Sequence, residues 1–170
     1  MKYTRTITLL ALCAAISACD TADTTLANGG ITLKDNIVTL HVDGAPDAQI
    51  DANGALVIGD KPVTVSPSQH GVLMLYFQNV SDVRQTGLAM GKIGAGMGMK
   101  AIKDSLDGKS KGEKDQDAEA GGQRLKTLGL KMCQDQASIT DIQDQLAAQL
   151  PAFKPYAKIS TKRVADCEKD

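Results

Sequence analysis

Residues 66–106 read SPSQHGVLMLYFQNVSDVRQTGLAMGKIGAGMGMKAIKDSL, and this stretch decides the fold of the chain. Ser66 fits a helix N-cap, Pro67 fits the first helical position, and Gln69 can complete a capping box. Apolar and small side chains then recur at three- and four-residue spacing, which is typical of one face of an α-helix. The pattern predicts a single helix of about 40 residues and about 60 Å. The residues on this face are Leu73, Tyr76, Phe77, Val80, Val83, Gly87, Met90, Gly91, Gly94, Gly98 and Ile102.

In the residues before this helix, apolar side chains recur with a period of two. Residues 37–42 (IVTLHV) alternate loosely, and Asn53-Gly54 is a strong hairpin-turn signal ahead of a second strand-like run. Residues 31–65 therefore predict an antiparallel β-meander of about three to five strands. The edges of such a sheet need covering, so we expect the long helix to pack on it.

The residues after the helix are more polar. Residues 107–123 carry alternating charges and several glycines. We expect a charged loop, or the frayed end of a helix, that reverses the chain, with a substrate-binding lid as the alternative. Residues 124–170 predict a helical C-terminal part, in which Ser138 restarts the helix and Pro151 ends it. The predicted fold class is α+β: one domain over residues 31–170, with an N-terminal antiparallel β-meander packed on a long Gly-rich helix and one or two returning helices.

The first residues are typical of an export signal. Lys2 and Arg5 precede an apolar stretch that is too short to span a bilayer, and small residues follow it. Ile16-Ser17-Ala18-Cys19 resembles the lipobox of bacterial lipoproteins. That resemblance implies cleavage after residues 1–18, a lipoprotein signal peptide, and a diacylglycerol on the Cys19 thiol. The alternative is an ordinary signal peptide that leaves Cys19 as a free thiol. Residues 19–30 are small and polar, which predicts a flexible tether.

The cysteine count supports lipidation. A chain cut before Cys19 keeps Cys19, Cys133 and Cys167, an odd number for an oxidising compartment. Lipidation of Cys19 leaves Cys133 and Cys167 free to form a disulfide, which we predict. We expect the protein on the periplasmic side of the bacterial cell envelope, anchored by its N-terminal lipid in the inner or the outer membrane.

The charge of the chain argues against nucleic acid as a partner. The formal net charge is −1, and loss of Lys2 and Arg5 with residues 1–18 makes it −3. A mildly acidic chain without a basic patch predicts no nucleic-acid binding, and it gives little support for electrostatic adhesion to anionic lipid.

Catalytic and metal-binding signals are weak. His41 lies in a strand pattern and His70 in the first turn of the long helix, and neither has partners at metal-ligand spacing. We therefore predict no catalytic residues, no metal and no cofactor. A calcium site is the alternative for a group of acidic and amide residues that turn chemistry explains better. These residues are Asp43, Asp47, Asp51 and Asn53.

The glycines of the long helix are the anomaly. Gly87, Gly91, Gly94 and Gly98 share one face, and each costs about 1 kcal/mol relative to Ala in a helix interior. Small residues at this spacing allow another backbone to approach, so we predict close helix packing at these positions, with a kink near residues 94–98 as one form of it. Insertion into a membrane is the alternative, which the nearby lysines disfavour. The lysines are Lys92, Lys100 and Lys103.

One family resemblance covers about half of the mature chain. Residues 36–40 (NIVTL), residues 49–63 (QIDANGALVIGDKPV) and the helix start at 66–77 resemble the YggN-like family of bacterial envelope proteins. That family has no established function, so the resemblance implies a fold and no catalytic residues. We expect a non-enzymatic envelope lipoprotein that binds or scaffolds another envelope component, with an envelope protein as its partner. A lipid-anchored periplasmic inhibitor or immunity protein against a toxin or hydrolase is the alternative, and an enzyme comes third.

Overall fold

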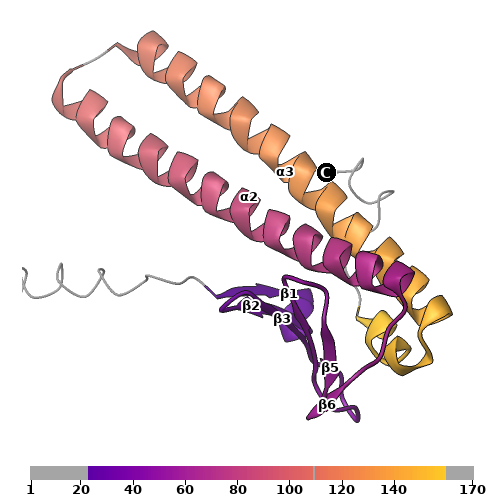
Figure 1. The fold of residues 1–170 in the computed structure, drawn as a ribbon. Coiled ribbons are helices and arrows are strands. Elements are labelled where there is room, and N and C mark those ends of the chain that lie inside the picture. Colours follow the sequence, from indigo (N-terminus) through magenta and orange to yellow (C-terminus); the bar gives the residue numbers. More distant parts are fainter. Residues whose placement is uncertain (1–22, 109, 160–170) are drawn as a thin grey trace, which may run out of the picture.

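A computed structural model describes residues 23–108 and 110–159 of the chain (Figure 1). An antiparallel sheet comes first, and two long helices follow it as a hairpin, so the predicted α+β class is confirmed. The strands are β1 (Thr24–Leu26), β2 (Ile31–Lys34), β3 (Ile37–Leu40), β4 (Ala48–Asp51), β5 (Leu56–Ile58) and β6 (Lys61–Pro62). The helices are α2 (Pro67–Leu106) and α3 (Lys111–Gln149), with short 3-10 turns η2 (Ala27–Gly29), η3 (Pro151–Phe153) and η4 (Tyr156–Lys158).

The sheet is a meander of six strands in which each strand pairs with the next one along the chain. Its turns follow from local chemistry. Asp35 and Asn36 both have positive φ angles, as a tight two-residue hairpin turn requires. Gly54 has φ +81°, and the Asp51 carboxylate accepts hydrogen bonds from the backbone N–H groups of Asn53 and Ala55, each at 2.9 Å. The predicted Asn53-Gly54 turn is therefore confirmed.

The sheet begins earlier than the sequence pattern predicts. Thr24 to Leu26 form β1, which pairs with β2 through Thr24–Leu33, Thr25–Thr32 and Leu26–Ile31. Residues 24–30 are therefore not part of a flexible tether, and the meander does not start at residue 31. The short threonine-rich run looks like linker by composition, but its β-branched side chains pair well with a neighbouring strand.

Helix α2 starts as its sequence predicts. The Gln69 backbone N–H donates to Ser66 Oγ at 3.3 Å, and the Ser66 N–H donates to Gln69 Oε1 at 2.8 Å, which completes the capping box. Gln69 Nε2 also donates to the Gln149 carbonyl oxygen at 2.7 Å. This one side chain thus ties the start of α2 to the end of α3. The helix runs without a break to Leu106, so the kink or break near residues 94–98 that the glycines allow does not interrupt it.

Helix α3 corrects two predictions. Most of the stretch predicted as a charged loop over 107–123 is helix from Lys111 onward, because alternating charges suit a solvated helix face as well as a loop. The helix also does not restart at Ser138. The Ser138 hydroxyl donates to the Gln134 carbonyl oxygen one turn back at 3.1 Å, which is how serine is accommodated inside a helix.

The core lies at one end of the helix hairpin, between the sheet, the first half of α2, the last part of α3 and the 3-10 turns. Phe153 stands edge-on to Tyr76 with ring centroids 6.1 Å apart, and 5.7 Å from the Tyr156 ring. The Tyr156 hydroxyl donates to the Pro46 carbonyl oxygen at 2.5 Å, which ties the end of the described chain to the sheet. The aliphatic side chains around these rings are Ile31, Leu33, Val38, Leu40, Ile50, Leu56, Leu73, Val80, Ile139 and Leu146.

The hairpin is longer than the sheet that it covers. Figure 1 shows the sheet beneath the first half of α2, while the other half of both helices continues past it. Thr86 is the last residue of that first half whose side chain is buried. We call the remainder of the hairpin, residues 87–106 of α2 and 111–128 of α3, the overhang.

Candidate functional site

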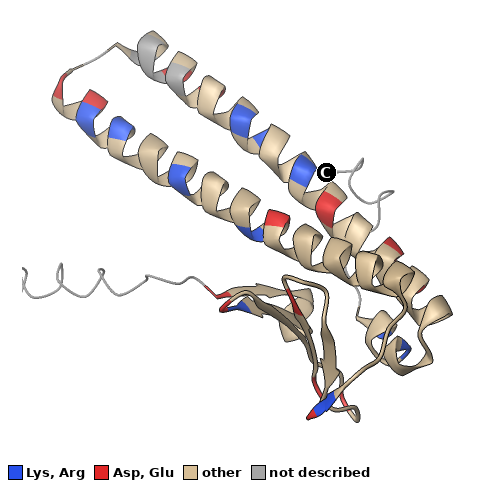
Figure 2. Cartoon of the chain, viewed as in Figure 1, with Lys and Arg blue, Asp and Glu red and all other residues tan. Residues whose placement is uncertain are grey.

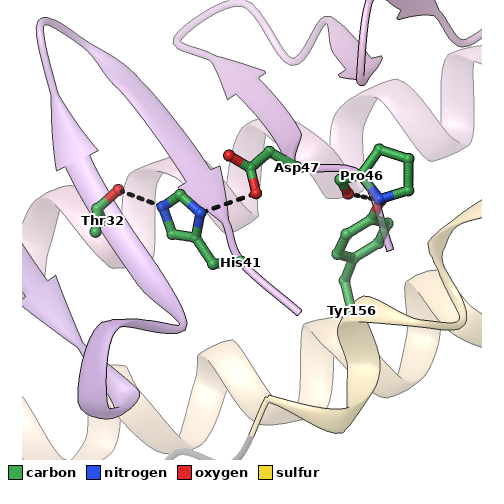
Figure 3. Close-up of polar contacts among 5 residues, drawn as sticks. All are labelled: Thr32, His41, Pro46, Asp47 and Tyr156. Carbon is green, nitrogen blue, oxygen red and sulfur yellow. Dashed lines mark hydrogen bonds and ion pairs between the residues drawn. The ribbon is translucent and has the colours of Figure 1, made fainter. Parts of the chain in front are cut away.

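A chain of polar contacts crosses the sheet at its open surface (Figure 3). His41, which follows β3, places Nδ1 2.9 Å from Asp47 Oδ1 and Nε2 3.4 Å from Thr32 Oγ1. The order hydroxyl, imidazole, carboxylate is that of a catalytic triad. The His41 and Asp47 side chains are 43% and 52% exposed, however, so water competes for both groups. A hydroxyl 3.4 Å away is also a weak partner for a general base. We interpret the contacts as fastening the loop before β4 to the sheet.

The acidic residues near these turns are engaged locally. Asp47 faces His41, and Asp51 accepts the turn N–H groups of Asn53 and Ala55. Turn chemistry therefore explains these carboxylates better than a calcium site. Within residues 23–108 and 110–159, no three His, Cys, Asp or Glu side chains gather closely enough to hold a metal ion. His70 is exposed in the first turn of α2.

The glycines of the overhang do not pack as predicted. A Cβ atom added at Gly91, Gly94 or Gly98 would meet nothing within 4 Å. One added at Gly87 would lie in ordinary contact, 3.5 Å from the Met132 Cε. The prediction of close helix packing at these four positions is therefore wrong. The glycines extend the face of α2 that packs on the sheet, but the sheet ends before it reaches them.

Close approaches occur at three other glycines. A Cβ at Gly30 would lie 2.8 Å from the Ile159 Cγ2. A Cβ at Gly121, on α3, would lie 2.9 Å from the Met97 Cε on α2. A Cβ at Gly54 would lie 2.8 Å from the His70 carbonyl oxygen, so this turn fits tightly against the first turn of α2. Sequence reasoning missed Gly121 because it falls in the stretch predicted as a loop. Its spacing relative to the small residues of α2 carries no signal that could have revealed the contact.

The overhang exposes large apolar side chains. On α2, Leu88 is 45% exposed, Met99 74%, Ile102 66% and Leu106 83%. Exposure of such side chains in a cluster indicates a surface that meets another molecule. Figure 2 shows that the charged residues of α2 within the overhang are mostly basic. They are Lys92, Lys100 and Lys103, against Asp104. This surface is the strongest candidate functional site in the described part of the chain.

A small cavity marks where the overhang begins. It is lined by Asp23 at the start of the described chain, by Arg84 of α2, and by residues 33–36 of the sheet. Arg84 Nε is buried there without a hydrogen-bond partner among the described residues. The N-terminal end of the sheet therefore lies beside α2 one turn before the overhang.

Of Cys19, Cys133 and Cys167, only Cys133 lies within the described residues. Cys133 is 8% exposed and disulfide-bonded. Cys19, predicted to carry lipid, and Cys167, predicted to pair with Cys133, lie outside the described residues. The identity of the disulfide partner and the lipidation both stay predictions.

Comparison with protein-family models, with curated proteins and with solved structures gives no match. The resemblance to the YggN-like family therefore stays a prediction that rests on the residues quoted for it. Neither α2 nor α3 has a stretch apolar enough to cross a bilayer.

Proposed function

We propose that this protein is a non-enzymatic lipoprotein of the bacterial cell envelope, held on the periplasmic side by lipid on Cys19. Support for the anchor comes from Ile16-Ser17-Ala18-Cys19 after an export signal. In this proposal the protein uses the overhang to bind or scaffold another envelope component, with an envelope protein as its partner.

The observation that carries this proposal is the overhang itself. A two-helix hairpin of this length is not needed to cover the sheet, because the core ends near Thr86. The overhang keeps glycines that weaken the helix, together with exposed Met99 and Leu106. Such a segment costs stability and contributes little core, which is typical of a surface kept for binding.

Two experiments test the two halves of the proposal. Metabolic labelling with a fatty-acid probe should mark the wild-type protein and not the Cys19→Ala variant, and equal labelling of both would refute the anchor. For the partner, a photo-crosslinking amino acid is placed at Lys126 on the exposed side of α3, and a matched control probe at Lys61 on β6.

The crosslinking outcomes separate binding from chance contact. We expect intact cells to yield a discrete crosslinked protein from position 126 and not from position 61. The same products from both positions, or none from position 126, would contradict binding through the overhang. A captured hydrolase whose activity falls when bound would favour the inhibitor alternative.

A further inference from the structure

The exposed apolar residues of the overhang form a continuous stripe along α2. Leu88, Ala95, Met99, Ile102 and Leu106 follow one another at spacings of three, four or seven residues, which places them on one side of a helix. Gly91 and Gly98 lie between them on the same side. We call these seven residues the apolar stripe. None of the seven is charged, and the exposure of its large side chains is greatest near the tip, at Leu106.

The charge beside this stripe has one sign. Residues 83–103 contain four basic residues and no acidic one, although the whole chain has a formal net charge of −1. Lys92 follows Leu88 by four residues and Lys103 follows Met99 by four, so these exposed lysines border the apolar stripe. The flanking acidic residues are Asp82, Asp104 and the exposed Asp107. By the helical period, Asp82 and Asp104 fall on the side of α2 opposite the stripe. An apolar stripe bordered by lysine fits an anionic surface that also has an apolar interior.

A second copy of the chain fits this surface poorly. Two overhangs laid stripe to stripe bring together segments that are both basic, and like charges held close destabilise a contact. A bilayer with anionic phospholipids has the complementary charge and accepts Met, Ile and Leu side chains at the boundary between headgroups and acyl chains.

The N-terminal end of the domain places the stripe near a membrane. Asp23 lines the same cavity as Arg84, just before the overhang. Only residues 20–22 separate Asp23 from Cys19, and four residue steps span at most about 14 Å. A lipid on Cys19 would therefore keep the base of the overhang close to the bilayer surface.

We propose that the apolar stripe lies in the surface of the membrane that holds Cys19, with its bordering lysines on the phosphates of anionic phospholipids. This inference rests on the proposed function, because the anchor supplies the proximity. It deepens that function by naming the bilayer as the envelope component that the exposed apolar side chains of α2 meet. The crosslinking probe at Lys126 on α3 tests for a protein partner separately.

The experiment uses residues 19–170 with Cys19→Ser, so that no acyl chain contributes to binding. The chain contains no tryptophan, so an Ile102→Trp variant reports only on the stripe. Vesicles of phosphatidylglycerol and phosphatidylcholine in equal parts should shift its emission to the blue, and brominated phospholipids should quench it. The matched control, Gln145→Trp on the exposed base of α3, should change neither its emission nor its quenching.

Charge reversal supplies the second readout. Lys92→Glu/Lys103→Glu should lower partitioning to these vesicles at least about tenfold, since each lysine near an anionic surface contributes to binding. Lys154→Glu/Lys158→Glu makes the same charge change at exposed sites far from the overhang and should leave partitioning within about twofold. Circular dichroism of each variant confirms that the helices are intact.

The outcomes are decisive in each direction. An unshifted Ile102→Trp spectrum, or equal partitioning of the two charge-reversed proteins, would overturn the proposal. A dimer in light scattering that Met99→Glu dissociates would assign the stripe to a second copy instead. Fatty-acid labelling of Cys19 is scored separately, so failure of the anchor is distinguishable from failure of the stripe.

Discussion

Replacing three of the unpacked glycines of α2 with alanine should stabilise the protein. In the Gly91→Ala/Gly94→Ala/Gly98→Ala variant, each new Cβ enters open space, since nothing lies within 4 Å of it. Alanine exceeds glycine in helix propensity by about 0.8–1 kcal/mol per exposed interior position, so the sum is about 2.5–3 kcal/mol. For a domain of this size, that corresponds to a rise in Tm of roughly 6–10 °C.

The assay is thermal and urea unfolding of residues 19–170 with Cys19→Ser, with circular dichroism as the signal that reports unfolding. Hydrogen exchange of the amides in residues 90–100 shows whether the gain is local to the overhang or shared with the core. Gly121→Ala is the matched control, because it brings the same propensity gain but must displace the Met97 side chain. It should therefore stabilise less than a single change at Gly94. A triple variant with lower Tm, or with unchanged Tm and unchanged exchange, would refute the reasoning.

Three further predictions concern the core and the cysteines. Gln143 Nε2 donates to the Tyr76 hydroxyl at 3.0 Å inside the core, so Tyr76→Phe should cost about 1–3 kcal/mol by leaving that amide unpaired, and adding Gln143→Leu should recover most of the loss in a double-mutant cycle of urea unfolding. Burial raises the pKa of the Tyr76 hydroxyl well above its ordinary value of 10.0, although the Gln143 hydrogen bond lowers that pKa. The free energy of unfolding should therefore be at its full value below about pH 10 and fall at higher pH, where Tyr76 ionises in the unfolded state. The fall should be shallower in Tyr76→Phe. If Cys133 pairs with Cys167, Cys133→Ala should cost about 4 kcal/mol, and mass mapping of non-reduced peptides that finds another partner for Cys133 would contradict the pairing.

The elements that sequence could predict are those with a strong local signal. Ser66, Pro67 and Gln69 specify the start of α2 through contacts within one helical turn, and Asn53-Gly54 specifies its turn in the same way. The meander follows because each strand pairs with its neighbour in the chain. These features need no knowledge of distant residues.

The predictions that failed depend on where another element ends. Glycines at 91, 94 and 98 would allow close packing, but the sheet ends before it reaches them. The sequence around these glycines does not indicate how far the sheet extends. Residues 111–123 form helix because α2 lies alongside them, since a stretch this polar has little reason to be helical alone. The apolar stripe was likewise invisible in the sequence, because its residues resemble core positions until the structure shows them exposed.

Two hydrogen bonds described above join residues that are synthesised far apart. Gln69 reaches Gln149 and Tyr156 reaches Pro46, over separations of 80 and 110 residues. The sheet leaves the ribosome first, and every strand can find its partner at once. Its apolar face must nevertheless wait for Phe153 and Tyr156, which arrive roughly 5–20 s later at typical rates of synthesis. Helices α2 and α3 precede these two residues and can cover part of that face, so the ring cluster closes the core last.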